Sequence, residues 1–139
     1  MSQTQTLENP NKLLPLFVTD KLAETKAFYV GELGWRATYD LEGYLQVRSA
    51  DADGPELCFM LPGAVPAMQR RFAGEGVIVS VPVASADEHY NGLLARGLRP
   101  LTEPTRKPWG WQSYLIADPS GLLLDFFHVA AAPAMAPAV

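Results

Sequence analysis

The sequence predicts an α+β domain in which two tandem β-α-β-β-β units form a half-open, barrel-like curved sheet. Strand-like and helix-like segments follow that order twice along the 139 residues. Each copy spans about 60 residues, and such internal duplication is the strongest organisational signal in the chain. A linker with two prolines and three glycines, residues 62–76, separates the copies. Because one copy could not easily bury both faces of its sheet, we expect two sheets that curl around a concave interior.

The first unit covers residues 12–61. Leu13–Val18 is a short apolar run whose Pro15 is typical of an edge strand. Thr19-Asp20 offers an N-cap for a helix over Lys21–Val30, and Gly31 follows at its end. Three strand-like segments with turn signals at Glu42-Gly43 and 51–54 complete the unit: Trp35–Asp40, Tyr44–Ser49 and Glu56–Leu61.

The second unit covers residues 77–129 and repeats the order. Val77–Val83 is a β-branched run, and Ser85 or Asp87 can cap a helix over Ala86–Arg96 that Gly97 ends. The turn Asp118-Pro119-Ser120-Gly121 has proline at its second and glycine at its fourth position. The three remaining strands are expected at Leu98–Pro100, Gln112–Ala117 and Leu122–Val129.

Composition excludes several classes of partner and location. The net charge of −4 and the scattered basic residues do not form the electrostatic footprint of a nucleic-acid-binding protein. No apolar stretch has the length of a membrane span, and residues 1–11 lack the features of a signal peptide. With Cys58 as the single cysteine, we expect a cytoplasmic protein whose residues 1–11 and 130–139 are flexible.

Three local patterns resemble signatures of the vicinal oxygen chelate superfamily, which contains glyoxalases, bleomycin-resistance proteins and dioxygenases. In chain order they are Val18-Thr19-Asp20 with Phe28-Tyr29 and Leu33-Gly34-Trp35, then Leu94-Ala95-Arg96-Gly97, then Pro108-Trp109-Gly110-Trp111 with Asp118–Phe126. The resemblance spans about residues 12–129 and implies the duplicated fold in one domain. It does not fix a reaction, because the superfamily includes lyases, dioxygenases, epimerases, thiol transferases and drug-binding proteins.

The resemblance also locates the positions at which metal-dependent members carry His, Gln or Glu ligands, one on the first and one on the last strand of each unit. Counting from the motifs gives Leu13, Cys58, Ile78 and Asp125, with Glu56 or Met60 in place of Cys58 if the register slips. Two aliphatic side chains and one carboxylate do not make a divalent-metal site. We therefore expect no metal and no cofactor.

The two histidines lie away from these positions. His89 falls on the second helix, where a solvated face is the simpler interpretation, and His128 should face opposite to Asp125 by strand alternation. A metal-dependent enzyme would need an unusual ligand set such as Glu56, Asp125 and His128.

If the superfamily geometry holds, Phe17 on the first strand and Asp125 with Phe127 on the last strand line the concave interior. Asp125 would bind a cationic or hydrogen-bonding ligand; a salt bridge to Arg48 or Arg106, or exposure at the rim, are the structural alternatives.

Trp109 and Trp111 lie in a Pro/Gly-flanked loop and could stack on a planar ligand, with Trp111 favoured; core packing and a dimer contact are the alternatives. The opposite wall would carry Tyr44 and Trp35, although Trp35 also fits the core, and Cys58 would be a small buried side chain. The predicted ligand-binding residues are thus Trp109, Trp111, Asp125, Phe17, Phe127, Tyr44, Trp35 and Cys58.

Three functions remain open at this point. The first is a metal-free protein resembling the bleomycin-resistance branch, a homodimer that sequesters an amphipathic or cationic aromatic compound in an aromatic-lined groove. The second is a metal-dependent glyoxalase-like lyase or extradiol-dioxygenase-like enzyme. The third is a degenerate member of the superfamily that acts through surface contacts. Leu13 and Ile78 favour the first and third over the second.

Overall fold

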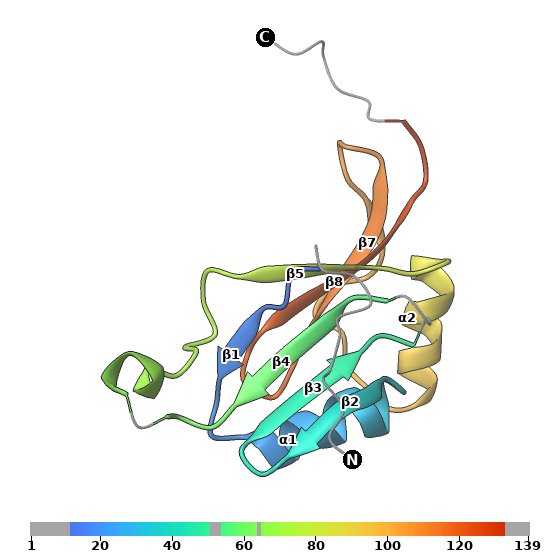
Figure 1. Ribbon diagram of the computed structural model, residues 1–139. Coiled ribbons are helices and arrows are strands. Elements are labelled where there is room, and N and C mark those ends of the chain that lie inside the picture. The colour runs from blue at the N-terminus through green and yellow to red at the C-terminus, as the bar shows by residue number, and fades with distance from the viewer. Residues whose placement is uncertain (1–11, 51–53, 64, 133–139) are drawn as a thin grey trace, which may run out of the picture.

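The computed structural model describes residues 12–50, 54–63 and 65–132, and in them the order β-α-β-β-β occurs twice (Figure 1). The first unit consists of β1 (Leu16–Val18), α1 (Leu22–Lys26) continued by the π-helix η1 (Ala27–Glu32), β2 (Arg36–Leu41), β3 (Tyr44–Arg48) and β4 (Glu56–Met60). The second consists of β5 (Ile78–Pro82), α2 (Ala86–Ala95), β6 (Thr105–Arg106), β7 (Trp111–Ala117) and β8 (Leu123–Val129). The linker contains the short 3-10 helix η2 (Pro66–Gln69). The predicted duplication is confirmed.

Each unit forms its own four-stranded mixed sheet, in the orders β1-β4-β3-β2 and β5-β8-β7-β6. The first strand of each unit runs parallel to the last one, and the other pairs are antiparallel. A parallel pair needs a long crossover, which the intervening helix and strands provide. The fold is therefore α+β, with two sheets that are not closed into a barrel.

The hydrophobic core lies on the helix side of both sheets. Alternate residues of the strands point there, as strand geometry requires, and pack against α1, η1 and α2; in Figure 1, α1 lies behind β2 and β3. We call this side of each sheet its helix face. The fully buried large residues from both units are Tyr29, Val47, Leu57, Phe59, Val81, Tyr114, Leu122, Leu124 and Phe126.

The first helix differs from the prediction in its start and in its last turns. Its N-cap is Lys21, without a side-chain capping bond, although the Thr19 hydroxyl accepts the Lys21 N–H at 3.1 Å. From Ala27 the helix widens into a π-helix, as the hydrogen bond from Leu33 N–H to the Phe28 carbonyl shows. In these wider turns the adjacent Phe28 and Tyr29 are both buried, so that both pack into the core.

The second helix agrees with the prediction. Ser85 is its N-cap and accepts the Glu88 N–H at 3.2 Å. The helix ends at Ala95, and the φ of +85° at the following Gly97 allows the Leu98 N–H to bond back to the Leu93 carbonyl at 3.0 Å. No helix in the part of the chain that the structure describes is long and apolar enough to cross a bilayer.

That cap explains the one strand that the sequence misplaced. Leu98–Pro100 is not a strand, because the Leu98 N–H is used by the end of α2. The edge strand forms later, as β6 at Thr105–Arg106, directly after Pro104. The predicted turn at Glu42-Gly43 is present, with Gly43 at φ +78°, whereas positions 51–53 of the other turn lie outside the described residues.

Residues of the first and third sequence patterns, which resemble the superfamily's signatures, join the units. The Tyr29 hydroxyl donates to Asp118 Oδ2 at 2.9 Å, and Asp118 Oδ1 accepts the N–H groups of Ser120 and Leu122 within its own turn. The hydroxyls of Thr19 and Ser120 lie 2.7 Å apart. Burial raises the pKa of Asp118, although these hydrogen bonds act to lower it, and burial also raises the pKa of Tyr29. The motif residues thus hold the first unit against the second.

Candidate functional site

The face of each sheet opposite its helix face carries the side chains that could bind a ligand. On the first sheet this face holds the polar side chains of Tyr44, Gln46, Arg48 and Glu56, together with Cys58; we call it the polar face. On the second sheet it holds Trp111, Ser113, Leu115, Asp125 and Phe127; we call it the aromatic face. Strand alternation decides both memberships, since these residues alternate with the core residues on β3, β4, β7 and β8.

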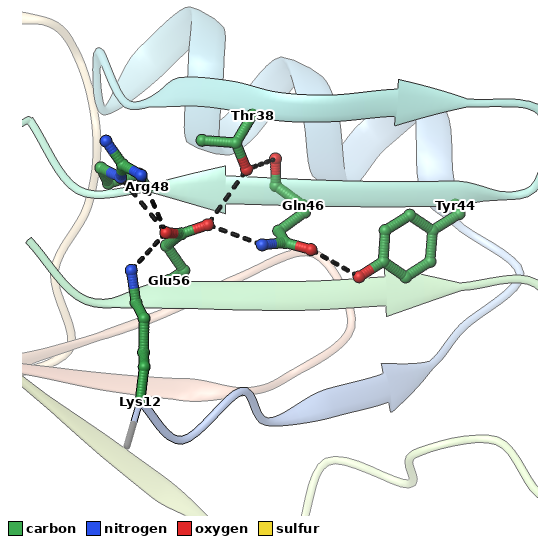
Figure 2. Close-up of polar contacts among 6 residues, drawn as sticks. All are labelled: Lys12, Thr38, Tyr44, Gln46, Arg48 and Glu56. Carbon is green, nitrogen blue, oxygen red and sulfur yellow. Dashed lines mark hydrogen bonds and ion pairs between the residues drawn. The ribbon is translucent and has the colours of Figure 1, made fainter. Parts of the chain in front are cut away.

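Glu56 is the centre of the polar face (Figure 2). Its Oε2 accepts from Arg48 Nε at 3.2 Å and Nη2 at 3.1 Å, and it pairs with the Lys12 ammonium. Its Oε1 accepts from Gln46 Nε2 at 2.7 Å and from the Thr38 hydroxyl at 3.1 Å. Both carboxylate oxygens therefore have two partners each.

Strand register brings these partners together. Arg48 lies directly opposite Glu56 on the neighbouring strand, and Gln46 lies two residues before Arg48 on the same face. The β2–β3 pairing shifts between Ala37 and Tyr39, so that Thr38 is the extra residue of a β-bulge. The bulge turns the Thr38 hydroxyl toward Glu56.

These contacts keep the Glu56 side chain ionised although it is buried. Burial disfavours the carboxylate, but the hydrogen bonds from Lys12, Gln46, Thr38 and Arg48 outweigh it and lower the pKa of Glu56 to about 2. Tyr44 donates to Gln46 Oε1 at 2.7 Å, and burial raises the pKa of this hydroxyl. A carboxylate that is already hydrogen-bonded on both oxygens is a poor general base, so this cluster stabilises the sheet or presents the Tyr44 hydroxyl and the two cations.

The aromatic face carries a stacked pair of rings. Trp111 and Phe127 lie parallel, with ring centroids 3.7 Å apart and an interplanar angle of 11°. Trp109 meets Trp111 edge to face at 6.2 Å and is 48% exposed. Asp125 lies two residues before Phe127 on the same strand, and its Oδ2 accepts the Ser80 hydroxyl at 3.1 Å. A planar ligand could extend the stack toward this carboxylate.

A tight turn presents both tryptophans. Gly110 N–H donates to the Lys107 carbonyl at 2.9 Å, and Lys107 N–H donates to the Trp111 carbonyl at 2.7 Å. Gly110 has φ +91°, and a Cβ built there would lie 2.1 Å from the Ala131 carbonyl oxygen. Only glycine fits this combination of backbone angle and close contact.

The structure brings together some of the predicted ligand-binding residues and separates others. Trp109, Trp111, Asp125 and Phe127 gather on the aromatic face. Tyr44 lies on the polar face beside Cys58, which is 2% exposed and thus buried as expected.

The other two lie on the core side of the first sheet. Phe17 packs against Phe59 and Phe72, because its register partner Phe59 belongs to the helix face; this corrects the expectation that its face lines the concave side. Trp35 is buried beside Tyr29, which agrees with the core alternative.

Neither histidine contributes to the two candidate faces. His128 lies opposite to Asp125 as predicted, on the helix face, where its Nδ1 accepts the Ala86 N–H at 2.8 Å. His89 was expected on a solvated face, but it is half-buried over Phe126 at 4.2 Å and hydrogen-bonded to the Tyr114 hydroxyl. Its pKa is lowered by burial and by Arg96.

The positions counted for metal ligands do not form a metal site. The end of each parallel strand pair is marked by the same hydrogen bond, from Thr19 N–H to the Met60 carbonyl in the first unit and from Val83 N–H to the Phe127 carbonyl in the second. Cys58 and Asp125 each lie two residues before the acceptor, so they occupy equivalent positions, as the count from the motifs gave. Their partners on the parallel strands are Leu16 and Ser80 rather than Leu13 and Ile78. Within residues 12–50, 54–63 and 65–132, no three His, Cys, Asp or Glu side chains are grouped to hold a metal ion. The donor set at these positions therefore does not fit a divalent metal ion.

Sequence reasoning missed the polar cluster, having weighed Glu56 only as a metal ligand in a slipped register. The signal was present in part: Tyr44, Gln46 and Arg48 alternate along one strand, and Glu56 begins the next. The bulge that adds Thr38 has no comparable signal in the sequence.

A small cavity lies at the junction of the two units. Its volume is about 100 Å³, and it is lined by Thr19, Asp20, Lys21, Arg71, Phe72 and Ser120. Pockets for drug-sized ligands have volumes of roughly 300–1,000 Å³. This cavity is therefore too small for such a ligand, and it lies away from both candidate faces.

Comparisons with known proteins agree with this geometry. A model of the Glyoxalase/Bleomycin resistance protein/Dioxygenase superfamily matches residues 13–126. No curated protein matches the sequence. Among solved structures, a glyoxalase/bleomycin resistance protein/dioxygenase from Nocardioides has a TM-score of 0.71 at 23% identity, over 95% of this chain and 93% of that chain.

Two similar structures bear names that describe a function. The bleomycin resistance determinant encoded on the transposon Tn5 has a TM-score of 0.64 at 18% identity, over 85% of this chain and 97% of its own. TnmS3, an antibiotic binding protein from Streptomyces sp. CB03234, has a TM-score of 0.63 at 22% identity, over 87% and 97%. At these identities the likeness concerns the fold.

Proposed function

Because the chain belongs to the glyoxalase/bleomycin resistance protein/dioxygenase superfamily, we propose that it is a small-molecule-binding protein of the bleomycin-resistance type. Its ligand would be an amphipathic or cationic aromatic compound, sequestered without a metal on the aromatic face. The similarity in fold to a bleomycin resistance determinant and to an antibiotic binding protein supports this choice within a superfamily of many activities.

The observation that carries the proposal is the stack of Trp111 and Phe127 next to Asp125. The two rings are parallel at 3.7 Å and half-buried, and Trp109 stands exposed beside them. Aromatic surfaces bind planar rings by stacking and bind cations through the face of the ring. Asp125 supplies a carboxylate in reach of a positive group on such a ligand, because Ser80 engages only one of its oxygens.

The metal-free part of the proposal rests on the donor set. Leu16, Cys58, Ser80 and Asp125 occupy the facing positions of the two parallel strand pairs, and they offer one carboxylate. Elemental analysis of protein purified without chelator, then after loading with nickel, iron, manganese or zinc salts, tests it. We expect substoichiometric metal after dialysis, and one retained ion per chain would contradict a metal-free site.

We further propose a homodimer in the cytoplasm, with the groove completed by the second copy. The edge strands β1 and β5 expose Leu16 (46%) and Ile78 (58%), and β8 ends on Val129 (67%). Exposed apolar side chains at sheet edges are costly unless another chain covers them. Light scattering coupled to gel filtration should give twice the 15.2 kDa chain mass, and the mass of one chain at micromolar concentration would contradict this.

A titration with a matched pair of ligands tests the binding function. Methylacridinium and uncharged acridine share one planar ring system, and their binding at slightly alkaline pH can be followed by tryptophan fluorescence. We expect saturable quenching by both, with the cation bound more tightly. Asp125→Asn keeps an acceptor for Ser80 but removes the charge. It should therefore weaken binding of the cation by about tenfold and leave the affinity for acridine unchanged.

The control is Asp40→Asn, which changes an exposed carboxylate paired with Lys26 outside the aromatic face. It should bind both compounds like the native protein. Quenching that does not saturate, or equal effects of the two substitutions, would contradict the proposed function.

A further inference from the structure

Lys107 places a positive charge on the aromatic face. Its N–H bonds to the Trp111 carbonyl at 2.7 Å, which sets Lys107 opposite Trp111, two residues beyond the pair Thr105–Ser113. Strand alternation then puts the side chains of Lys107, Thr105 and Ser113 on the same face as Trp111. The hydrogen bonds of the Lys107 ammonium to Thr105 and Ser113 agree with this placement.

The partners of this ammonium are all uncharged. Lys107 Nζ donates to Thr105 Oγ1 at 2.6 Å, to the Thr105 carbonyl at 3.2 Å and to the Ser113 carbonyl at 3.2 Å. Over the described ranges, which omit 1–11, 51–53, 64 and 133–139, Lys107 forms no ion pair, whereas Lys12, Lys26, Arg48 and Arg71 each do. Three hydrogen bonds thus hold the charge in a fixed position, without a counter-ion among the described residues.

A second observation concerns the hydroxyl of Ser113 on the same face. The Ser113 hydroxyl is buried and has no hydrogen-bond partner in the described structure, although its own carbonyl accepts from Lys107. A buried hydroxyl without a partner costs free energy unless something else satisfies it. An acidic ligand group that draws the ammonium outward would let a ligand oxygen or a water molecule reach this hydroxyl.

We propose that Lys107 is a specificity-determining residue that binds an anionic oxygen group of the ligand, such as a carboxylate or sulfonate. The ring of the same ligand stacks at Trp111 and Trp109 beside it. From strand spacing and rise per residue, the ammonium lies on the order of 10 Å from the Asp125 carboxylate across the stacked rings. The aromatic face therefore selects a planar compound with an acidic group at one end and a basic group at the other.

This inference rests on the proposed function, and the test separates the two. Anilinonaphthalene sulfonate and uncharged anilinonaphthalene have the same rings and differ by one sulfonate, and both fluoresce when bound. We expect the native protein to bind the sulfonate more tightly. Lys107→Gln should weaken binding of the sulfonate at least about tenfold and leave the affinity for the uncharged compound unchanged. Trp111→Ala should weaken binding of both compounds.

Two further variants guard against loss of structure. Lys107→Arg keeps the charge and should retain most of the preference for the sulfonate, and Thr105→Val removes the hydroxyl that orients the ammonium and should reduce it in part. Lys26→Gln, at a surface ion pair on the first unit, is the matched control and should behave like the native protein.

The outcomes are distinct. Equal binding of both compounds that Lys107→Gln does not alter, while Trp111→Ala abolishes it, would overturn the role of Lys107 and leave the aromatic site standing. Binding that neither Lys107→Gln nor Trp111→Ala changes would overturn both the inference and the proposed function.

Discussion

At the scale of single residues, two carboxylates differ in their surroundings: Glu56 on β4 and Asp125 on β8. Glu56 is enclosed by four donor side chains, which occupy both of its carboxylate oxygens. Among the described residues, Asp125 has one side-chain hydrogen-bond partner, and it shares its face with the stacked rings. The first is suited to holding a sheet together, and the second is suited to binding.

The pKa of Glu56 gives a prediction for acid unfolding. Its value of about 2 in the folded chain is below the ordinary 4.5, so folding is favoured by the ionised form. This stabilisation is complete above about pH 4.5 and is lost as pH falls toward 2. Glu56→Gln should cost about 1–2 kcal/mol at neutral pH and should flatten the acid limb of a plot of unfolding free energy against pH.

The control for that substitution is Glu42→Gln, which changes an exposed carboxylate in the turn between β2 and β3. Urea unfolding at a series of pH values measures both variants. An acid limb in Glu56→Gln that is as steep as in the native protein would contradict the assignment.

Contacts between individual side chains were the hardest feature to predict from the sequence. The positions of Trp109, Trp111, Asp125 and Phe127 on one face follow from alternation and motif order, and those residues do gather. Phe17 did not follow, because its pairing with the core residue Phe59 decides which face it joins, and an apolar run gives no sign of that register. The Glu56 cluster depends on a bulge, which no local pattern in the sequence signals.

At the scale of elements, the turn before β7 controls the candidate site. It is closed by the bond from Gly110 N–H to the Lys107 carbonyl, and it orients both tryptophans and Lys107. Gly110→Ala would strain a backbone at φ +91° and would force the Ala131 carbonyl away from a contact of 2.1 Å. We expect a loss of about 2 kcal/mol or more in unfolding free energy, together with weaker binding of aromatic compounds.

Gly92→Ala is the matched substitution. Gly92 lies within α2 at a negative φ, and a Cβ there would meet nothing within 4 Å. Because alanine is the better helix former, this change should stabilise the protein by roughly 0.5–1 kcal/mol. Thermal unfolding followed by circular dichroism compares the two, and equal effects would contradict the constraint at Gly110.

Element prediction was accurate where local signals agreed. Ser85 and Gly97 delimit α2 as expected, and the Asp118–Gly121 turn separates β7 from β8. The prediction was wrong at Leu98–Pro100, because the backbone N–H of Leu98 is committed to the helix end rather than to a strand. The π-helix in η1 likewise depends on packing in the finished core, which a helical periodicity does not distinguish from an ordinary helix.

At the scale of the whole molecule, two sheets with one common core depend on the contacts between the units. The Tyr29–Asp118 hydrogen bond, the Thr19–Ser120 contact and the bond from Arg96 to the Glu32 carbonyl at 2.7 Å all cross from one unit to the other. Duplication and motif order predicted this architecture from sequence, since each copy needs the other to complete its core.

Tyr29→Phe removes one hydroxyl from this junction and leaves Asp118 Oδ2 buried without its donor. We expect a loss of about 1–3 kcal/mol in unfolding free energy. Tyr90→Phe is the control, because Tyr90 packs edge-on against Tyr114 at 5.2 Å and no described contact uses its hydroxyl. Urea unfolding of both variants is the measurement, and equal stabilities would contradict a structural role for the Tyr29 hydroxyl.

If the aromatic face of the second sheet binds the ligand, the three tryptophans of the chain report on it directly. The measurement is a titration of ¹⁵N-labelled protein with methylacridinium, followed at the three indole N–H signals in two-dimensional NMR spectra. We predict large saturable shifts for Trp109 and Trp111 and an unchanged signal for Trp35, which is buried in the core beside Tyr29. Shifts confined to Trp35, or no saturable shift at Trp109 and Trp111, would contradict ligand binding at the aromatic face.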